Sequence, residues 1–375
     1  MRVLYVINGF NQGGAEHGLL TLLENGFFEG HDLRVLALCR GHGGLAETVG
    51  KAAGAGRLRL AHDSEALTMG SMLKGAFALA GEMRRHRPDL VVLSLKQANI
   101  VGRFVLCFFP KARCVSFEHI MRYRSRRLQW VYQYLLWLLS FRVGEVWGDC
   151  RDTIDETKRY FMPIRQRRSQ VVPLFCVQEG TQSKSDYGLA QPLRMAVAGR
   201  LSPVKNIDKL IGAVRRLIDS GTPVVLDVFG DGPEYANLEK TIKDLGLDDS
   251  VTLLGFRQAW FTDGPSYDIY VNASDTEGFC IVVAEAMAVG LPVITTDVGG
   301  IRDYGRDGVN MMKFAVPDEA SIVEHVEALT KDEALRRKIG TQAATDMAEN
   351  YSAAALRTAG SRVLEALPGT ADTGT

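Results

Sequence analysis

The sequence of 375 residues has few of the features that mark secreted, metal-stapled or membrane-spanning proteins. Its six cysteines form no Cys-x-x-Cys pair and have no metal-ligand spacing, which disfavours a disulfide framework and a zinc site. No apolar run approaches the roughly 18 residues that a membrane-spanning helix requires. The opening MRVLYVING has neither the long apolar region nor the cleavage site of a signal peptide. We therefore expect a cytoplasmic protein with reduced thiols.

The chain also lacks net charge, because 44 basic and 44 acidic side chains cancel. The two halves nevertheless differ. Residues 1–185 hold 26 Lys and Arg against 16 Asp and Glu, a net charge of +10, and residues 186–375 hold the remaining 18 and 28, a net charge of −10. Because this length corresponds to about two domains, the asymmetry indicates two domains with different partners, the first facing something anionic.

Short apolar runs alternate with helix-length amphipathic segments along the chain. Continuous β-branched runs are typical of strands buried on both faces of a parallel sheet. The expected strands are 3–7, 32–38, 90–95, 112–117, 143–146 and 170–172, then 194–198, 223–229, 251–254, 269–272 and 292–295. Two successive βαβ series predict two doubly wound α/β domains. The polar stretch QEGTQSKSDYGLAQ at 178–191 separates them, and we expect a linker there.

The stretch SDTEGFCIVVAEAMAVGLPVI at 274–294 reads as a loop, a turn and the start of a helix, and it contains two glutamates in this region. The turn and helix start comprise Gly278, Phe279, Cys280 and Ile281. The N–H groups at a helix N-terminus favour a diphosphate. Glu277 and Glu285 would then need other partners, and sugar or ribose hydroxyls suit them because a carboxylate accepts hydroxyl hydrogen bonds. Taken singly, either glutamate can equally be an ordinary charged helix residue.

The spacing of Glu277 and Glu285, followed by Ala-Met-Ala-x-Gly-x-Pro-Val, resembles the signature of retaining GT-B glycosyltransferases of family 4. Other segments similar to that family are Gly13-Gly14-Ala15-Glu16, Ala198-Gly199-Arg200-Leu201 with Lys205, the run VFGDGP at 228–233, and Leu254-Gly255-Phe256. The resemblance covers nearly all of the second domain and scattered points of the first. It implies the GT-B fold, in which two Rossmann-like domains face a cleft and a C-terminal helix crosses back to the first domain.

The same resemblance implies a domain organisation and a reaction. An acceptor-side domain would span 1–180, a nucleotide-sugar-binding domain 190–350, a closing helix 351–367 and a disordered tail 368–375. The reaction would move a sugar from a nucleotide-sugar, with UDP favoured, to a hydroxyl of a glycan or lipid-linked acceptor. Retention at the anomeric carbon, no metal or other cofactor, and a role in cell-surface polysaccharide or glycolipid synthesis are implied too.

Carried over residue by residue, the resemblance assigns the catalytic roles to Arg200, Lys205, Glu277 and His119. Arg200 and Lys205 would hold the donor diphosphate, Glu277 the sugar hydroxyls and Glu285 the ribose. His119, which follows an apolar strand in the run SFEH, would orient the sugar or polarise a hydroxyl. Further donor contacts would come from Gly13, Gly14, Gly230, Arg257, Gly278, Phe279, Cys280 and Ile281. At position 280 the family more often has glycine, so we expect a bulkier phosphate loop here.

Other functions stay open. A nucleotide-sugar epimerase shares the GT-B fold, and a non-catalytic sugar-nucleotide-binding paralogue would share its residues. A classical dehydrogenase is disfavoured, because Tyr235 stands where the third glycine of a dinucleotide motif belongs.

The segment RYRSRRLQWVYQYLLWLLSF at 122–141 combines a basic start with an aromatic, apolar remainder. Its cations are Arg122, Arg124, Arg126 and Arg127. Interfacial segments pair cations with Trp and Tyr in this way, so docking on an anionic membrane at the inner face is one hypothesis. A buried helix is the alternative. Nucleic-acid binding is weakly supported, because no nucleic-acid-binding motif accompanies the charge.

Overall fold

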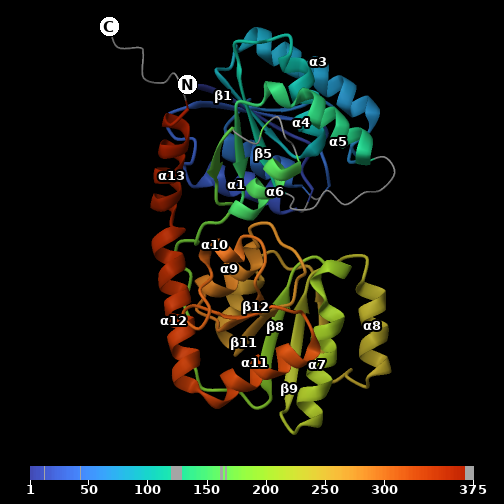
Figure 1. Cartoon of the computed structure of the whole chain (residues 1–375), viewed down its shortest axis with the longest axis vertical. Coiled ribbons are helices and arrows are strands. Elements are labelled where there is room, and N and C mark those ends of the chain that lie inside the picture. The colour runs from blue at the N-terminus through green and yellow to red at the C-terminus, as the bar shows by residue number, and fades with distance from the viewer. Residues whose placement is uncertain (12, 43, 120–128, 161–163, 165–166, 368–375) are drawn as a thin grey trace. The chain divides into compact units, whose positions relative to one another are not determined.

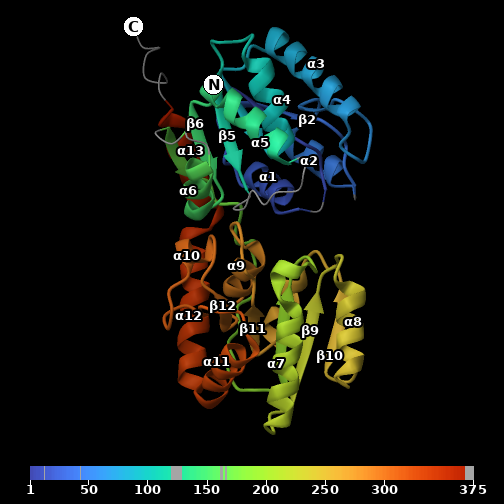
Figure 2. The ribbon, with the colours of Figure 1, turned by 45° about the vertical axis from the view of Figure 1, so that its right-hand side comes forward.

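The computed structural model describes residues 1–11, 13–42, 44–119, 129–160, 164 and 167–367. The chain divides into two compact units. Unit 1 comprises Met1–Cys176 together with the chain from Ala353 onward, and unit 2 comprises Val177–Ser352. Both units are layers of helices on a parallel sheet (Figures 1 and 2).

The described residues of unit 1 form a seven-stranded parallel sheet in the order β3-β2-β1-β4-β5-β6-β7. Its strands are β1 (Arg2–Ile7), β2 (Asp32–Ala37), β3 (Leu58–Leu60), β4 (Leu90–Ser94), β5 (Arg113–Glu118), β6 (Glu145–Gly148) and β7 (Arg168–Val171). The order reverses between β1 and β4, and ligands of open parallel sheets bind beyond the carboxyl ends of strands at such a switch point.

The helices of unit 1 are α1 (Gly14–Glu24), α2 (Leu45–Ala53), α3 (Met69–Arg85), α4 (Lys96–Leu106), α5 (Gln129–Leu138), the 3₁₀ turn η1 (Leu139–Arg142), α6 (Arg151–Tyr160) and α13 (Ala353–Glu365). A reciprocal capping box between Thr68 and Ser71 starts α3. Helix α4 packs against α3 on one side and α5 on the other, so the three form a continuous row (Figure 1).

The C-terminal helix α13 packs tightly within unit 1. A Cβ at Gly360 would lie 2.0 Å from the carbonyl oxygen of Phe27, so only glycine permits this approach. The Arg168 guanidinium donates a hydrogen bond of 2.8 Å to the carbonyl of Ala366. The N-terminal part of the chain, Met1–Cys176, therefore shares a folding unit with the last helix.

The described residues of unit 2 form a six-stranded parallel sheet in the order β10-β9-β8-β11-β12-β13. Its strands are β8 (Leu193–Ala198), β9 (Val224–Phe229), β10 (Val251–Gly255), β11 (Ile269–Asn272), β12 (Val293–Thr296) and β13 (Met312–Phe314). The helices are η3 (Pro203–Lys205), α7 (Ile207–Asp219), α8 (Tyr235–Asp244), η4 (Trp260–Ser266), α9 (Ile281–Ala288), α10 (Ile301–Tyr304), α11 (Glu319–Lys331) and α12 (Glu333–Asn350). The prediction of two doubly wound parallel α/β domains is confirmed.

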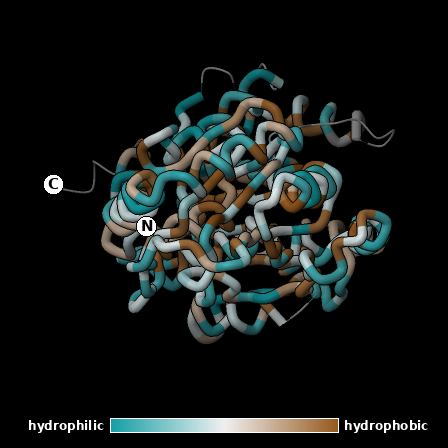
Figure 3. The backbone as a smooth tube through the Cα atoms, turned by 90° about the horizontal axis from the view of Figure 1, so that it is seen from below, coloured by the Kyte–Doolittle hydropathy of each residue, from teal (hydrophilic) through white to brown (hydrophobic). Residues whose placement is uncertain are grey.

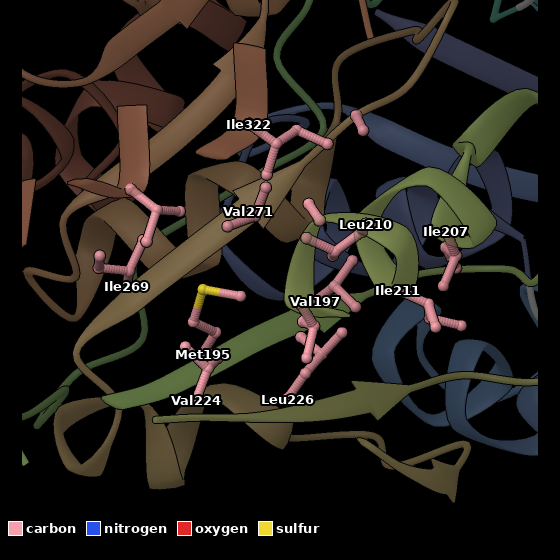
Figure 4. Packing of buried hydrophobic residues seen from close by; sticks show 14 of the residues in the cluster. Met195, Val197, Ile207, Leu210, Ile211, Val224, Leu226, Ile269, Val271 and Ile322 are labelled. Atoms are coloured by element: carbon pink, nitrogen blue, oxygen red, sulfur yellow. The ribbon is translucent and has the colours of Figure 1, made fainter. Parts of the chain in front are cut away.

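The core of unit 2 lies between β8, β9, β11 and the helices α7 and α11 (Figure 4). Met195, Val197 and Leu226 point from the strands towards Leu210 and Ile211 of α7, and all five are buried. The hydropathy colouring shows the amphipathic pattern behind this packing, with hydrophilic stretches on outer helices and hydrophobic stretches among the strands (Figure 3). This core holds the strand ends, and hence the loops after them, in fixed positions.

The polar segment expected to act as a linker is counted with unit 2. Lys184 donates hydrogen bonds of 3.0 and 2.8 Å to the carbonyls of Pro265 and Tyr267. The buried Tyr187 hydroxyl donates one of 3.1 Å to Gly290. These polar side chains thus pack on the domain by bonding to backbone, which hydrophobic periodicity does not reveal.

Candidate functional site

The loops that follow neighbouring strands of unit 2 meet at the carboxyl edge of its sheet. A Cβ at Gly230, after β9, would lie 1.9 Å from the carbonyl oxygen of Gly199, after β8. Gly230 also has a φ of +143°, which side chains disfavour. The Leu201 N–H donates a hydrogen bond of 3.0 Å to the Asp231 carbonyl. Gly199 and Gly230 therefore allow the loops after β8 and β9 to come into contact. This contact supports Arg200, which lies between Gly199 and Leu201.

Lys205 and Glu277 form an ion pair at this edge. The Lys205 Nζ lies 2.6 Å from the Glu277 Oε1, and the two side chains are 16% and 9% exposed. The Ser274 hydroxyl donates a second hydrogen bond, of 2.5 Å, to the same oxygen. Burial lowers the pKa of Lys205, but the Glu277 carboxylate more than offsets this, so the pKa lies above its ordinary value and the amine stays cationic.

The turn that carries Lys205 is locked to the Glu277 loop. Asn206 adopts a left-handed conformation and starts α7, and its amide donates hydrogen bonds of 2.9 Å to the Ala273 carbonyl and 3.0 Å to an Asp275 carboxylate oxygen. The Asp275 N–H in turn donates one of 2.8 Å to the Val204 carbonyl. These hydrogen bonds thus fasten the loops after β8 and β11 to each other.

The loop from Glu277 to Cys280 leads directly into α9. Phe279 is buried against the rings of Tyr304 and Tyr351, with ring centroids 5.3 and 5.5 Å away. Cys280 has a φ of +64°, a conformation that costs a residue with a side chain about 1–2 kcal/mol and that glycine adopts without this cost. No side chain forms a capping hydrogen bond at α9 within the described residues, so the N–H groups of Ile281 and Val282 have no intrahelical acceptor.

Gly299 and Gly300, after β12, support the same loop from the other side. A Cβ at Gly299 would lie 2.3 Å from the Glu277 carbonyl oxygen, and the Gly300 N–H donates a hydrogen bond of 2.7 Å to the Gly278 carbonyl. The backbone of the α9 mouth is therefore held on two sides before any ligand binds.

Glu285 lies one turn inside α9 and is partly buried. The Trp260 indole N–H donates a hydrogen bond of 2.8 Å to its Oε2. Burial raises the pKa of Glu285 to about 7, against the opposing effect of Trp260. Trp260 itself stacks on Tyr270 at 5.1 Å. Glu285 is thus a fixed carboxyl group that ionises near neutral pH.

The two arginines predicted for the site are exposed. The Arg257 guanidinium lies 5.6 Å from the ring centroid of Phe229 and 3.7 Å from an Asp263 carboxylate oxygen. Arg200 forms no hydrogen bond or ion pair with any described side chain, so its guanidinium is available to a ligand.

Sequence analysis missed the supporting residues Trp260, Ser274 and Asn206, for which no local motif provides a signal.

The predicted residues of unit 1 lie at the carboxyl ends of β1 and β5. His119 Nε2 lies 2.9 Å from the Ser94 hydroxyl, and the ring packs on Phe117 at 4.3 Å. Its Nδ1 is buried and has no partner among the described residues. Burial lowers the pKa of His119 to about 3, so the imidazole is neutral at physiological pH and can offer a nitrogen to a hydroxyl.

Gly13 precedes α1 and Gly14 is its first residue. A Cβ at Gly13 would lie 2.5 Å from a Glu16 carboxylate oxygen, so the buried Glu16 carboxyl folds back over the glycine loop. Burial raises the pKa of Glu16 although the backbone N–H groups of Glu16 and Asn11 oppose this. The predicted site residues therefore form two groups, one in each unit. Sequence analysis named Glu16 as part of the glycine segment but gave it no role.

Comparison with known proteins agrees with the geometry of unit 2. Residues 183–346 match the family model of glycosyl transferases group 1. The structure resembles that of HepE of Anabaena in complex with UDP, with a TM-score of 0.81 and 19% sequence identity. The match covers 98% of this chain and 100% of the HepE chain. The fold is GT-B. Together these matches show that most of unit 2 is similar to glycosyl transferases group 1 and that the chain shares its fold with HepE.

Two curated relatives align with parts of the GT-B chain. N-acetyl-alpha-D-glucosaminyl L-malate synthase of Bacillus anthracis is 29% identical over 172 residues, 46% of this chain and 45% of the relative. Lipopolysaccharide core biosynthesis glycosyltransferase LpsE of Rhizobium meliloti is 28% identical over 187 residues, 50% of this chain and 54% of the relative. The chain thus spans about half the length of each.

Proposed function

We propose that this GT-B protein is a glycosyltransferase that moves a sugar from a nucleotide-sugar to a hydroxyl of a glycan or lipid-linked acceptor. The observation that carries the proposal is the group at the carboxyl edge of unit 2. There the Lys205–Glu277 pair, the uncapped start of α9 and an unpaired Arg200 lie on loops that are fastened to one another.

The positive groups of this edge suit a diphosphate. Arg200 and the first two N–H groups of α9, those of Ile281 and Val282, are the parts without a partner in the described structure. Arginine binds phosphate oxygens in pairs, and a helix N-terminus attracts anions. As the bond to the sugar breaks, negative charge grows on the departing nucleotide, and fixed cations stabilise it. Lys205, held by Glu277, adds charge beside that phosphate.

The carboxylates suit hydroxyl groups. Glu277 Oε1 is engaged by Lys205 and Ser274, which leaves the second oxygen to accept from the sugar. Glu285, fixed by Trp260, is placed to accept from a ribose. UDP is the proposed nucleotide, supported by the complex of HepE with UDP.

We propose transfer with retention, in the manner of family 4, without a covalent intermediate on the enzyme. Glu277 is held as an anchor by a cation and a hydroxyl, which reduces its strength as a nucleophile. The leaving phosphate oxygen would then accept the proton of the attacking hydroxyl. The anomeric configuration of the product, determined by NMR, tests retention, because inversion would exclude it.

We also propose that transfer needs no metal. Arg200, Lys205 and the start of α9 provide the positive charge that a divalent cation supplies in other transferases. Full transfer activity after dialysis against EDTA supports this, and activity restored only by added Mg²⁺ or Mn²⁺ contradicts it.

Unit 1 is the proposed acceptor side and carries His119. The row α3–α5 of this unit exposes large apolar side chains: Met69, Leu73, Phe77, Phe104, Phe108, Tyr134, Trp137, Leu138 and Phe141. The single acidic residue in these three described helices is Glu82, which is buried, whereas Lys74, Arg84 and Arg85 are exposed. Of the two alternatives for the aromatic segment, a fully buried helix does not hold for α5, where Tyr134, Trp137 and Leu138 are exposed. Arg122, Arg124, Arg126 and Arg127 lie outside the described residues.

We therefore propose that this row, called the α3–α5 face, docks on an anionic membrane and brings unit 1 to a lipid-linked acceptor. Apolar side chains with basic neighbours and no exposed acid match such a surface. No helix among the described residues is long and apolar enough to traverse a bilayer. The proposed site of action is the cytoplasmic face of the membrane.

A screen of nucleotide-sugars tests the central proposal. The correct donor should raise the melting temperature of the full chain, and the same donor should support sugar transfer to glycan or lipid acceptors. Conversion of the donor without any acceptor would instead indicate an epimerase. Donor binding with neither reaction would indicate a non-catalytic paralogue.

A further inference from the structure

A cavity of about 270 Å³ in unit 1 is lined largely by basic side chains. It lies between the first residues of β2 and β3 and the last turn of α3. Its cationic lining comes from Arg34, Arg57, Arg59 and Arg85, with His86 beside them. None of the lining residues belongs to the candidate site described above, which occupies the opposite, carboxyl ends of the strands.

The single carboxylate of the lining, Glu82, is already engaged. Its Oε1 lies 2.6 Å from the Arg59 guanidinium and its Oε2 lies 3.1 Å from His86 Nε2. Arg57 has a distant partner, Asp32, at 3.8 Å. Two guanidinium groups, those of Arg34 and Arg85, have no carboxylate partner among the described residues.

Arg34 gives the most specific indication of a ligand. Its Nε is buried, and no described residue accepts a hydrogen bond from it. A buried donor without an acceptor costs free energy comparable to the desolvation of that group. Guanidinium groups gathered around one cavity also repel each other. An anion that accepts from several of them would remove both penalties.

We propose that this cavity binds a phosphate monoester group. The planar arginine fork pairs with phosphate oxygens two at a time, and Arg34, Arg57 and Arg85 offer more donors than one carboxylate can accept. The volume lies just below the range of ordinary small-molecule sites, so it fits a phosphate with a small organic group. The phosphate can belong to a soluble ester or to a lipid headgroup.

Calorimetric titration of the full chain with inorganic phosphate, at constant ionic strength, tests the proposal. We expect saturable binding that weakens at least tenfold in the double variant Arg34→Gln/Arg85→Gln. Arg84→Gln, which changes the exposed neighbour of Arg85 outside the cavity, should bind as the parent does. Arg200→Ala should remove any phosphate binding at the candidate donor site and retain the binding that depends on Arg34 and Arg85, which separates the two sites. No saturable binding, or unaltered binding by the double variant, overturns the proposal.

A second measurement avoids dependence on the folding of variants. Phosphate should slow the modification of Arg34 and Arg85 by phenylglyoxal in the parent protein, as mapped by peptide mass spectrometry. Equal modification with and without phosphate contradicts the proposal.

Vesicles then distinguish the two sources. If the phosphate is a headgroup, the double variant should float less than the parent with phosphatidylcholine vesicles that contain phosphatidic acid, and equally with vesicles that contain phosphatidylserine at the same charge, which tests only the α3–α5 face. If the double variant loses binding of inorganic phosphate but floats as the parent does, the ligand is a soluble ester.

Discussion

The Lys205 Nζ and the Glu277 Oε1 are 2.6 Å apart, and they come from loops that follow the neighbouring strands β8 and β11. The resemblance assigned these residues separate contacts with a donor, but the structure shows that each is also the other's partner. The pair would couple the proposed phosphate side of the candidate site to the proposed sugar side.

Lys205→Met should destabilise the protein by about 2–3 kcal/mol, because it leaves a mostly buried carboxylate without its cation. Lys205→Met/Glu277→Gln should recover much of that loss while transfer activity stays absent. Urea denaturation of the single and double variants measures the coupling. Strictly additive losses would show that the pair contributes no interaction energy in the folded state.

Arg200→Ala should lower kcat/KM by roughly 100-fold or more, in line with loss of one group that stabilises developing charge. The melting temperature should not change, because Arg200 is exposed and has no described partner. Lys240→Ala, an exposed cation on α8, is the matched control and should alter neither quantity. Near-normal transfer by Arg200→Ala would remove this residue from the site.

The pKa of Glu285 predicts a pH-dependent stability. The folded pKa is about 7 against an ordinary value of 4.5, so the folded protein holds this proton more tightly and loses stability as the pH rises from 4.5 to 7. Glu285→Gln carries no such charge. Relative to the variant, the free energy of unfolding of the parent should therefore fall by about 2–3 kcal/mol between pH 4.5 and pH 8. A difference that is constant with pH, measured by urea denaturation, would contradict the buried environment of Glu285.

Gly230→Ala should destabilise the folded protein far more than an ordinary glycine replacement. Its Cβ would meet the Gly199 carbonyl oxygen at 1.9 Å, so the loop that carries Arg200 must move. Gly221→Ala is the control, since Gly221 has a φ of +89° but open space around it. We expect about 1 kcal/mol of strain for Gly221→Ala and a several-fold larger loss for Gly230→Ala, with weaker donor binding. Equal melting temperatures would show that the two loops separate at no cost.

Flotation with vesicles tests the α3–α5 face. Recovery should be higher with anionic than with neutral vesicles, and both Phe77→Ser/Phe108→Ser and the change of Arg122, Arg124, Arg126 and Arg127 to Ala should reduce it. Phe256→Ser, which removes an exposed phenylalanine from unit 2, should have no effect. Equal recovery from neutral and anionic vesicles would exclude the proposed electrostatic docking.

Elements with strong periodicity were predictable from sequence, and contacts between distant elements were not. The apolar positions between 207 and 219 repeat with helical spacing, which predicts a helix there, and α7 has these bounds and buries that face. The strands β3 and β13 were not anticipated, since each has three residues and incomplete burial. Short edge strands offer too few positions to show a period.

In the candidate site, too, local patterns were predictable from sequence and contacts between distant residues were not. The motif around Glu277 located the start of α9, because a turn followed by an apolar helix is a local pattern. The hydrogen bond from Trp260 to Glu285 joins positions 25 residues apart, and it depends on how η4 packs. The left-handed conformation of Cys280 was equally hidden, since cysteine gives no signal for a positive φ.

The assignment of α13 to unit 1 has a consequence for synthesis on the ribosome. Unit 2 is a continuous stretch, Val177–Ser352, placed between two parts of unit 1. Domains fold as units while the chain emerges, so unit 2 can complete its fold first. Unit 1 must wait, its surface around Phe27 uncovered, until the helix containing Gly360 has left the ribosomal tunnel.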